Sequence, residues 1–291
     1  MVKRRGKKSA RRWRLPKLPQ WDLSWATSRG TLVAVVWVLS AGGLVTAWVL
    51  GTPRLEAYAS AHQADGDVVV RLVDLPTWVE ADLESMLVET AVRHIGDDPL
   101  QRADLMDARE ALLATGWFVS VDQVRRVGTR VVDVTATLAK PFAVIRDRSR
   151  VRDHLVDAQG RVLPRTYAPG EPSGYIGLTG ARYGAPTHSG MTWPGADVAA
   201  ALDVLALIND KPWLDQVVRI DLTRHRKDGS IRLVTDRNCT IVWGRAPGDE
   251  AGSDVPASQK LSYLDYHYEQ YGHIDRGLEE LDITGDVVVG R

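Results

Sequence analysis

The chain changes its hydrophobic period abruptly at Gly116, and this change limits the folds that it can adopt. Before Gly116, residues 105–113 place apolar side chains at helical spacing among charged ones. After it, residues 117–121 alternate apolar and polar side chains, and residues 132–138 do so again beyond Gly128. The sequence therefore predicts a helix that ends at Thr115 or Gly116 and is followed by a β-hairpin.

Two further elements are expected upstream of this helix. Residues 67–72 form a short β-rich run, and residues 80–95 form an amphipathic stretch whose apolar positions share one helical face. The order strand, helix, helix, strand, strand is therefore predicted for residues 67–140.

The remaining residues, 141–291, predict a β-rich domain with flanking helices. A chain of 291 residues exceeds the usual size of one domain, about 100–150 residues, so two folded units are expected. Within 141–291 we expect helices at 196–208 and 258–271, strands at 142–145, 175–178, 217–222, 230–235 and 239–243, a hairpin around 155–163 and a final strand at 281–289. The expected fold class is α+β.

Charge is distributed unevenly along the chain. Residues 1–30 carry ten Lys or Arg against one acid, a net charge of +9, and the rest of the chain carries −9 because the total is zero. Residues 31–51 contain no charged side chain. A helix of this length spans about 30 Å, the thickness of the hydrocarbon core of a bilayer. We therefore expect a short basic cytoplasmic tail at 1–30, one transmembrane helix at 31–51 and a linker at 52–66.

The basic leader also predicts an orientation and a location. Because Lys and Arg are retained on the cytoplasmic side, the amino terminus is expected inside and the rest outside, in a single-pass protein of the inner membrane. A cleaved signal peptide is the alternative, with a small-residue site near residues 57–61. The leader has no folded motif for nucleic acid, so no specific nucleic acid is expected, whereas contact with anionic lipid stays open.

Nothing in the sequence predicts catalysis. Cys239 is alone in the chain and lies in a strand-like setting, so it is expected to be a small buried residue. The histidines at 154, 225, 267 and 273 show no metal-ligand spacing, and there is neither a nucleophile elbow nor a phosphate loop. We therefore expect no enzyme activity, no cofactor, no metal and no small-molecule substrate.

Several short motifs together carry a resemblance. They are "LLATGWFVSVDQVRRVGTRVVDVTATLAKPFAVIRD", "HLVDAQGRVLP", "CTIVWG", "QKLSYLDYHY" and "LDITGDVVVGR". In this order, after a basic leader and an apolar run, they resemble the FtsQ/DivIB family of bacterial cell-division proteins. The resemblance implies a POTRA domain at 67–140 followed by the family's β-domain at 141–291.

The resemblance also implies a function in binding. It identifies a divisome scaffold that holds small bitopic coiled-coil proteins of the FtsB/FtsL (DivIC) type and other divisome components. The alternative is a non-enzymatic, membrane-anchored POTRA protein of export or envelope assembly. A membrane-anchored sensor is disfavoured because about 30 basic residues cannot bury a core of their own.

The expected binding surface is the carboxy-terminal strand, residues 281–289, with the helix before it. If this strand lies at the sheet edge, its free backbone groups are available to an added strand. The alternative is that the strand is merely an edge. The candidate partner-binding residues are Tyr263, Tyr266, His267, Leu281, Ile283, Gly285, Val287, Val288 and Val289.

Overall fold

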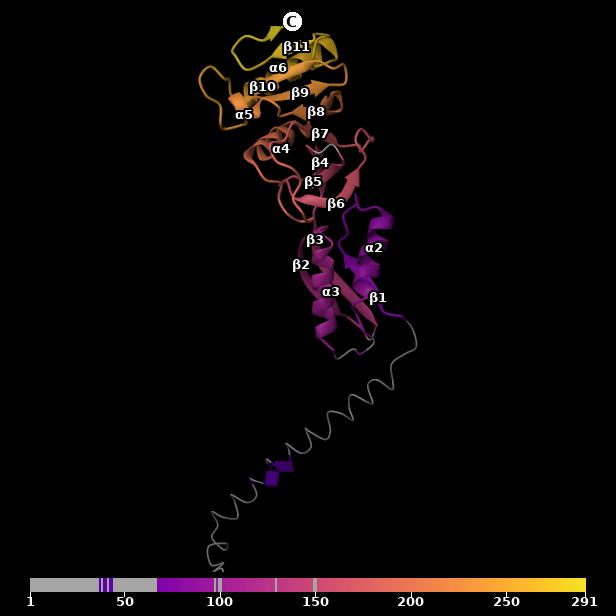
Figure 1. The fold of residues 1–291 in the computed structure, drawn as a ribbon. Helices are drawn as coiled ribbons and strands as arrows, with labels where there is room; N and C mark the ends of the chain where they lie inside the picture. The colour runs from indigo at the N-terminus through magenta and orange to yellow at the C-terminus, as the bar shows by residue number, and fades with distance from the viewer. Residues whose placement is uncertain are drawn as a thin grey trace, which may run out of the picture. The chain divides into compact units, whose positions relative to one another are not determined.

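The structure is a computed structural model, and two compact units are present, Met1–Gln63 and Ala64–Arg291. The residues described are 37, 39–40, 42–43, 67–96, 98, 101–128, 130–148 and 151–291. The second unit carries both sheets (Figure 1).

One element of the expected fold class is corrected. Within the described residues, no helix combines the length and the apolar character needed to cross a membrane. This finding contradicts the expected transmembrane helix and, with it, the expected localisation as a single-pass inner-membrane protein. Most of the segment 31–51, the whole tail at 1–30 and the whole linker at 52–66 lie outside the described residues; the described members of 31–51, which are Trp37, Leu39, Ser40, Gly42 and Gly43, are helical.

The order strand, helix, helix, strand, strand is present at the start of the unit. The elements are β1 (Val69–Val73), α2 (Ala81–Val92), α3 (Ala103–Ala114), β2 (Phe118–Arg126) and β3 (Val131–Leu138). The strand β3 is central, parallel to β1 and antiparallel to β2. Leu87 of α2 and Leu112 of α3 are fully buried and pack in one cluster with Val132 and Val134 of β3. The alternating apolar side chains of β3 therefore form the sheet surface on which the two helices pack.

Gly116 ends α3 for a steric reason. Its φ is +80°, a backbone conformation that L side chains rarely adopt. A Cβ at this position would also lie 2.8 Å from the Ser189 side chain. The change of period at Gly116 therefore coincides with a turn that favours glycine.

The second sheet has nine strands in the order β12-β11-β10-β9-β8-β7-β4-β5-β6. Its elements are β4 (Pro141–Arg146), β5 (Asp153–Asp157), β6 (Val162–Tyr167), β7 (Ile176–Thr179), α4 (Ala196–Ile208), the 3-10 turn Leu214–Gln216, β8 (Val217–Asp221), α5 (His225–Asp228), β9 (Ile231–Thr235), β10 (Thr240–Gly244), α6 (Ala257–Tyr271), β11 (Glu280–Asp282) and β12 (Val289–Gly290). The pairs β4–β7, β7–β8 and β10–β11 are parallel, and the other pairs are antiparallel. The helix α4 connects β7 to β8 and α6 connects β10 to β11, as parallel neighbours require.

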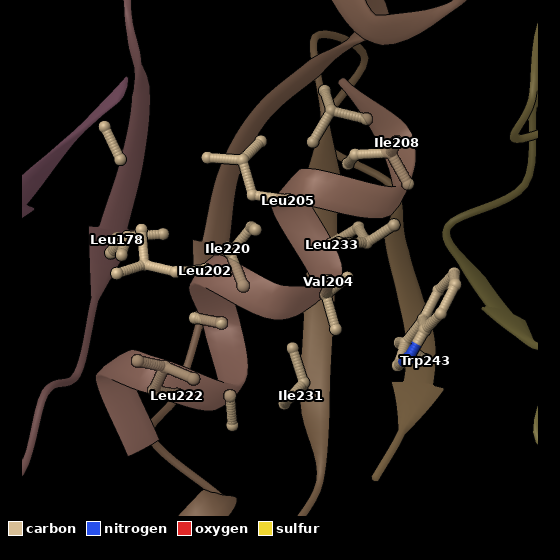
Figure 2. Close-up of a cluster of buried hydrophobic side chains, with 14 of the residues drawn as sticks. Leu178, Leu202, Val204, Leu205, Ile208, Ile220, Leu222, Ile231, Leu233 and Trp243 are labelled. Carbon is tan, nitrogen blue, oxygen red and sulfur yellow. The ribbon is translucent and has the colours of Figure 1, made fainter. Parts of the chain in front are cut away.

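The helices α4 and α6 belong to the main apolar core of this sheet. Figure 2 shows Leu202, Leu205 and Ile208 of α4 lying over Ile220 of β8 and Leu233 of β9. The same core includes Trp243 of β10 and Leu264 of α6. The near-continuous apolar sequence of α4 is explained by this burial, because nearly every turn of the helix meets the sheet.

Contacts also join the two sheets within the unit. Leu163 and Tyr167 of β6 are buried in the same cluster as Trp117 and Phe118. The Arg161 guanidinium, in the turn before β6, donates to the Phe118 carbonyl of β2 at 3.4 Å. The β6 edge of the large sheet therefore packs on the first module, which is the three-stranded sheet β1–β3 with α2 and α3. The strand β12 forms the opposite edge of the large sheet.

The expected final strand is corrected. Residues 281–289 do not form one strand, because β11 ends at Asp282 and β12 begins only at Val289. Asp282 Oδ1 accepts hydrogen bonds from the Thr284 N–H at 2.9 Å and the Thr284 hydroxyl at 2.7 Å, which turns the chain. The carboxy-terminal segment is thus a hairpin.

Candidate partner-binding edge

The hairpin leaves one side of β12 open. On its inner side, Leu281 faces Gly290 and Asp282 faces Val289. The Arg291 N–H donates to the Glu280 carbonyl at 2.9 Å, and the Glu280 N–H donates back at 3.3 Å. Among the described residues no strand pairs with the other side of β12. It is therefore β12, and not β11, that forms the edge.

The pairing fixes which backbone groups face outward. In an antiparallel ladder, residues alternate between those bonded to the neighbouring strand and those that point away from it. Because Arg291 is bonded to Glu280, the N–H and C=O groups of Gly290 point away from β11, and the same alternation continued to the residue before β12 turns those of Val288 outward. An added strand would find its first hydrogen bonds at these two residues.

Apolar side chains flank this edge. Val287 is 74% exposed and Val289 is 55% exposed. Val288 is partly buried against the main core and Gly285 is partly exposed, so both hold the loop rather than present an anchor. Exposed valines beside unpaired backbone groups are suited to contact an incoming strand.

The structure separates the nine candidate residues into anchors and supports. Leu281 and Ile283 are fully buried, and His267 is 4% exposed, so their side chains cannot form the contact surface. Burial also lowers the pKa of His267, whose Nδ1 lies 3.2 Å from the Ile274 carbonyl oxygen. These three residues therefore support the edge from the core.

The two candidate tyrosines on α6, Tyr263 and Tyr266, differ from one another. The Tyr263 hydroxyl donates to the Asp286 carbonyl at 3.1 Å and so ties α6 to the loop before β12. Tyr266 lies one helical turn later and is 56% exposed. Tyr263 therefore fixes the loop to the helix, whereas the side chain of Tyr266 is open to solvent.

Further contacts keep the hairpin close to the core. The Val255 N–H donates to the Thr284 carbonyl at 2.7 Å. A Cβ placed on Gly290 would clash with the Leu278 side chain, so a glycine allows β12 to lie beneath that leucine. The edge is thus held in place in the absence of a partner.

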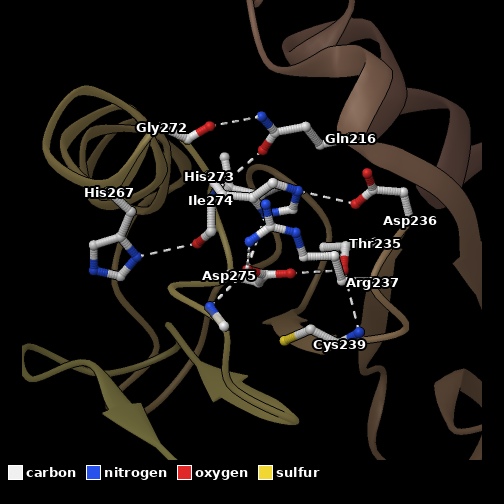
Figure 3. Close-up of polar contacts among 11 residues, drawn as sticks. Gln216, Thr235, Asp236, Arg237, Cys239, His267, Gly272, His273, Ile274 and Asp275 are labelled. Carbon is white, nitrogen blue, oxygen red and sulfur yellow. Dashed lines mark hydrogen bonds and ion pairs between the residues drawn. The ribbon is translucent and has the colours of Figure 1, made fainter.

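A polar network fixes the turn that leads from α6 into β11 (Figure 3). Asp275 is fully buried and accepts hydrogen bonds from the Thr235 hydroxyl at 3.0 Å and the Gly277 N–H at 2.8 Å. Gln216 bonds both sides of this turn, donating to the Gly272 carbonyl and accepting from the Ile274 N–H. The network holds the base of the hairpin against the β9–β10 turn.

His273 bridges two carboxylates in this network. Its Nε2 lies 3.0 Å from Asp236 Oδ1 and its Nδ1 lies 2.9 Å from Asp275 Oδ1. One ligand atom from each of these three residues lies within 4.8 Å of the other two, so the group is close enough together to hold a metal ion. The imidazole therefore lies between the carboxylate of the β9–β10 turn and that of the turn after α6 and bridges the two turns.

We expect Asp275→Ala to loosen the hairpin. Removal of the buried acceptor leaves the donors around it unsatisfied, at a cost of about 1–3 kcal/mol for each buried donor. Amide hydrogen exchange of residues 272–291 should accelerate more than that of β8 and β9. The control is Asp286→Ala, an exposed carboxylate in the neighbouring loop, which should change the stability by less than about 0.5 kcal/mol. Unchanged exchange in Asp275→Ala would contradict this role.

Cys239 is buried beside the same network. It is fully buried in the main core, and its N–H donates to the Thr235 hydroxyl at 3.1 Å. Burial, together with the smaller effect of the charges of Asp275 and Glu280, raises the pKa of the Cys239 thiol to about 12. The thiol is therefore protonated at neutral pH.

We expect the Cys239 thiol to resist alkylation by iodoacetamide at pH 8 in the folded protein and to react once the protein is unfolded. Cys239→Ser should leave partner binding unchanged, because the thiol contributes no chemistry to the edge. The measurement is mass spectrometry of the alkylated protein with and without denaturant. Rapid labelling of the native protein would contradict the assignment.

Sequence patterns missed the members of this network that come from turns. Gln216 and Asp236 belong to a short 3-10 turn and a hairpin loop, where no periodicity marks a residue as buried or bonded. The only signal was the turn composition of 236–238, which predicts a bend but not its contacts.

Comparison with protein-family models and with curated proteins found no match for this chain. The assignment of a partner to the β12 edge therefore depends on the geometry described above and on the sequence resemblance.

Proposed function

We propose that the chain is a non-enzymatic scaffold of bacterial cell division, similar to the FtsQ/DivIB family, that binds other division proteins by strand addition at β12. The observation that carries the proposal is the open edge, where the backbone groups of Val288 and Gly290 point outward between the exposed side chains of Val287 and Val289. An extended partner segment would extend the nine-stranded sheet by one strand.

The charge around the edge indicates which partner segment would fit. Residues 279–291 contain four acids and one arginine, a local net charge of −3. An incoming strand flanked by Lys or Arg would therefore be favoured over an acidic one, and the preference should weaken with salt. Tyr266 on α6 offers a neighbouring aromatic anchor.

The proposed partners are small coiled-coil proteins of the FtsB/FtsL (DivIC) type. A coiled coil presents its own helices to one another, so a short extended segment beyond the coil is the part that would pair with β12. The scaffold would hold this segment and so couple the coiled-coil proteins to other divisome components.

A second candidate function is a POTRA-containing protein of export or envelope assembly. It is favoured by the three-stranded sheet, in which β1 and β2 each have a neighbour on one side only among the described residues. This function would place the main contact on the first module, whereas the division scaffold would place it on β12.

The test is affinity purification of the tagged chain from dividing cells after cross-linking, combined with depletion of the protein. We expect small coiled-coil division proteins to co-purify and depleted cells to become long filaments. Normal division on depletion, with export or envelope-assembly proteins in the purified material, would contradict the scaffold role and favour the second candidate.

A further inference from the structure

A cavity of about 1210 Å³ opens where three neighbouring strands of the large sheet end. Arg146, Thr179 and Asp221 line it, and they are the last residues of β4, β7 and β8. These strands are mutually parallel, so their carboxyl ends lie on the same side. Ligands of open α/β sheets bind outside the carboxyl ends of such strands.

The start of α4 also lines this cavity, through residues 195–197. The helix has 13 residues, and its amino-terminal N–H groups carry partial positive charge. The cavity therefore combines parallel strand ends with a helix amino terminus.

Arginine is the most frequent charged residue in the lining. Five arginines face three aspartates, a net charge of +2. Three of the five are engaged: Arg146 pairs with Asp153 at 3.4 Å, the Arg148 guanidinium donates to the Arg182 carbonyl at 2.8 Å, and the Arg182 guanidinium lies 5.1 Å from the Tyr183 ring centroid. Among the described residues, no carboxylate lies within ion-pair distance of the Arg219 or Arg226 guanidinium.

The carboxylate of Asp197 indicates that a ligand of this cavity should also carry a hydrogen-bond donor. It is 5% exposed, and its Oδ2 accepts a hydrogen bond from the Arg182 N–H at 2.6 Å. Its Oδ1 is buried and has no hydrogen-bond partner among the described residues. A buried carboxylate oxygen without a donor is costly, so a ligand that brings an N–H or O–H group would satisfy it.

We infer that this cavity is a second binding site, which takes an extended acidic peptide segment of a protein partner. Acidic side chains of the segment pair with Arg219 and Arg226, and a backbone N–H reaches Asp197 Oδ1. A phosphate polymer offers the negative charge but no amide donor for Asp197 Oδ1. The volume exceeds the roughly 300–1,000 Å³ of small-molecule pockets, as a peptide segment requires.

This site is independent of the proposed strand addition. It is built at the ends of β4, β7 and β8, whereas strand addition uses β12, which is separated from β8 by three strands in the sheet. The two sites also prefer opposite charges, because the β12 hairpin is acidic and the cavity is basic.

The test is fluorescence anisotropy of a labelled octapeptide of alternating Glu and Ala, titrated with the purified full chain. A counterpart with Gln in place of Glu and an inorganic polyphosphate competitor form the other two arms. We expect the acidic peptide to bind, the Gln counterpart to bind at least about tenfold more weakly, and the affinity to fall with salt.

Variants locate the binding. Arg219→Gln with Arg226→Gln should weaken the acidic peptide about tenfold or more, since both ion pairs are lost. Arg125→Gln, an exposed arginine on β2 outside the cavity, is the matched control and should leave the affinity unchanged. Thermal melting confirms that the variants are folded, and Val288→Pro should keep full peptide affinity.

Two outcomes would overturn the inference. Equal binding of the Glu and Gln peptides would show that acidic side chains are not recognised. Polyphosphate that binds more tightly than the peptide and loses its affinity in the same double variant would show that the cavity takes phosphate instead.

Discussion

Lys260→Met is expected to lower the free energy of unfolding by about 3–5 kcal/mol. Lys260 is fully buried, and its Nζ lies 2.7 Å from Asp254 Oδ1, which is itself nearly buried. Neither Lys260 Nζ nor Asp254 Oδ1 has a hydrogen-bond partner among the described residues. Each charge is therefore compensated in the core mainly by the opposite charge of the other residue. Removal of the lysine leaves the aspartate charge in the core without a counter-ion.

The surroundings of Lys260 explain why the loss affects the edge region. Its ammonium group lies 5.5 Å from the centroid of the Trp243 ring on β10. Asp254 Oδ2 accepts a hydrogen bond from the Arg245 N–H at 3.1 Å. The pair therefore joins α6, β10 and the loop between them, which together support β11 and β12.

Chemical denaturation followed by circular dichroism measures this effect. The control is Arg93→Met, which breaks the exposed Arg93–Glu89 pair on α2 and should cost less than about 0.5 kcal/mol. The double variant Lys260→Met/Asp254→Asn removes both charges and should recover part of the loss. A cost for Lys260→Met as small as that for Arg93→Met would contradict the buried pair.

Val288→Pro is expected to weaken partner binding roughly 10- to 100-fold, which corresponds to about 1.4–2.8 kcal/mol. Proline removes the outward N–H of Val288, and its ring obstructs the approach of a neighbouring strand. The domain should stay folded, because an edge position tolerates proline where a central strand does not.

The matched control for this variant is Val288→Ala, which removes the branched side chain but keeps the N–H. Isothermal titration of both variants with the co-purified partner separates backbone from side-chain effects. Full affinity in Val288→Pro would show that β12 does not pair with the partner.

The sequence predicted those helices and strands whose buried side chains recur at one constant spacing. The helix at 196–208 was predicted with its bounds because it lies on the sheet over its whole length. The strands at 217–222, 230–235 and 239–243 were predicted to within a residue or two because turn residues separate them.

The final hairpin was missed because two signals compete there. The β-branched run at 287–289 predicts a strand that continues from 281, but Thr284 and Gly285 separate the two, and Asp282 accepts two hydrogen bonds from Thr284 that close the turn. A pattern of alternating residues cannot show that the chain reverses between two strands of three and two residues.

The polar partners of the sites could not be predicted from the sequence for a different reason. Lys260 looks like an ordinary surface lysine of an amphipathic helix until Trp243 and Asp254 are placed around it. The arginines of the cavity come from four separate segments, and only the parallel ends of β4, β7 and β8 bring them together. Tertiary contacts of this kind leave no local pattern.

Amide hydrogen exchange at Val288 and Gly290 tests strand addition at β12 most directly. These two N–H groups point away from β11, so in the free protein they should exchange quickly. We expect the extended segment of the partner to slow the exchange of both amides, while the amide of the exposed Val218 on β8 stays unchanged. Partner binding that leaves Val288 and Gly290 unprotected would contradict strand addition at β12.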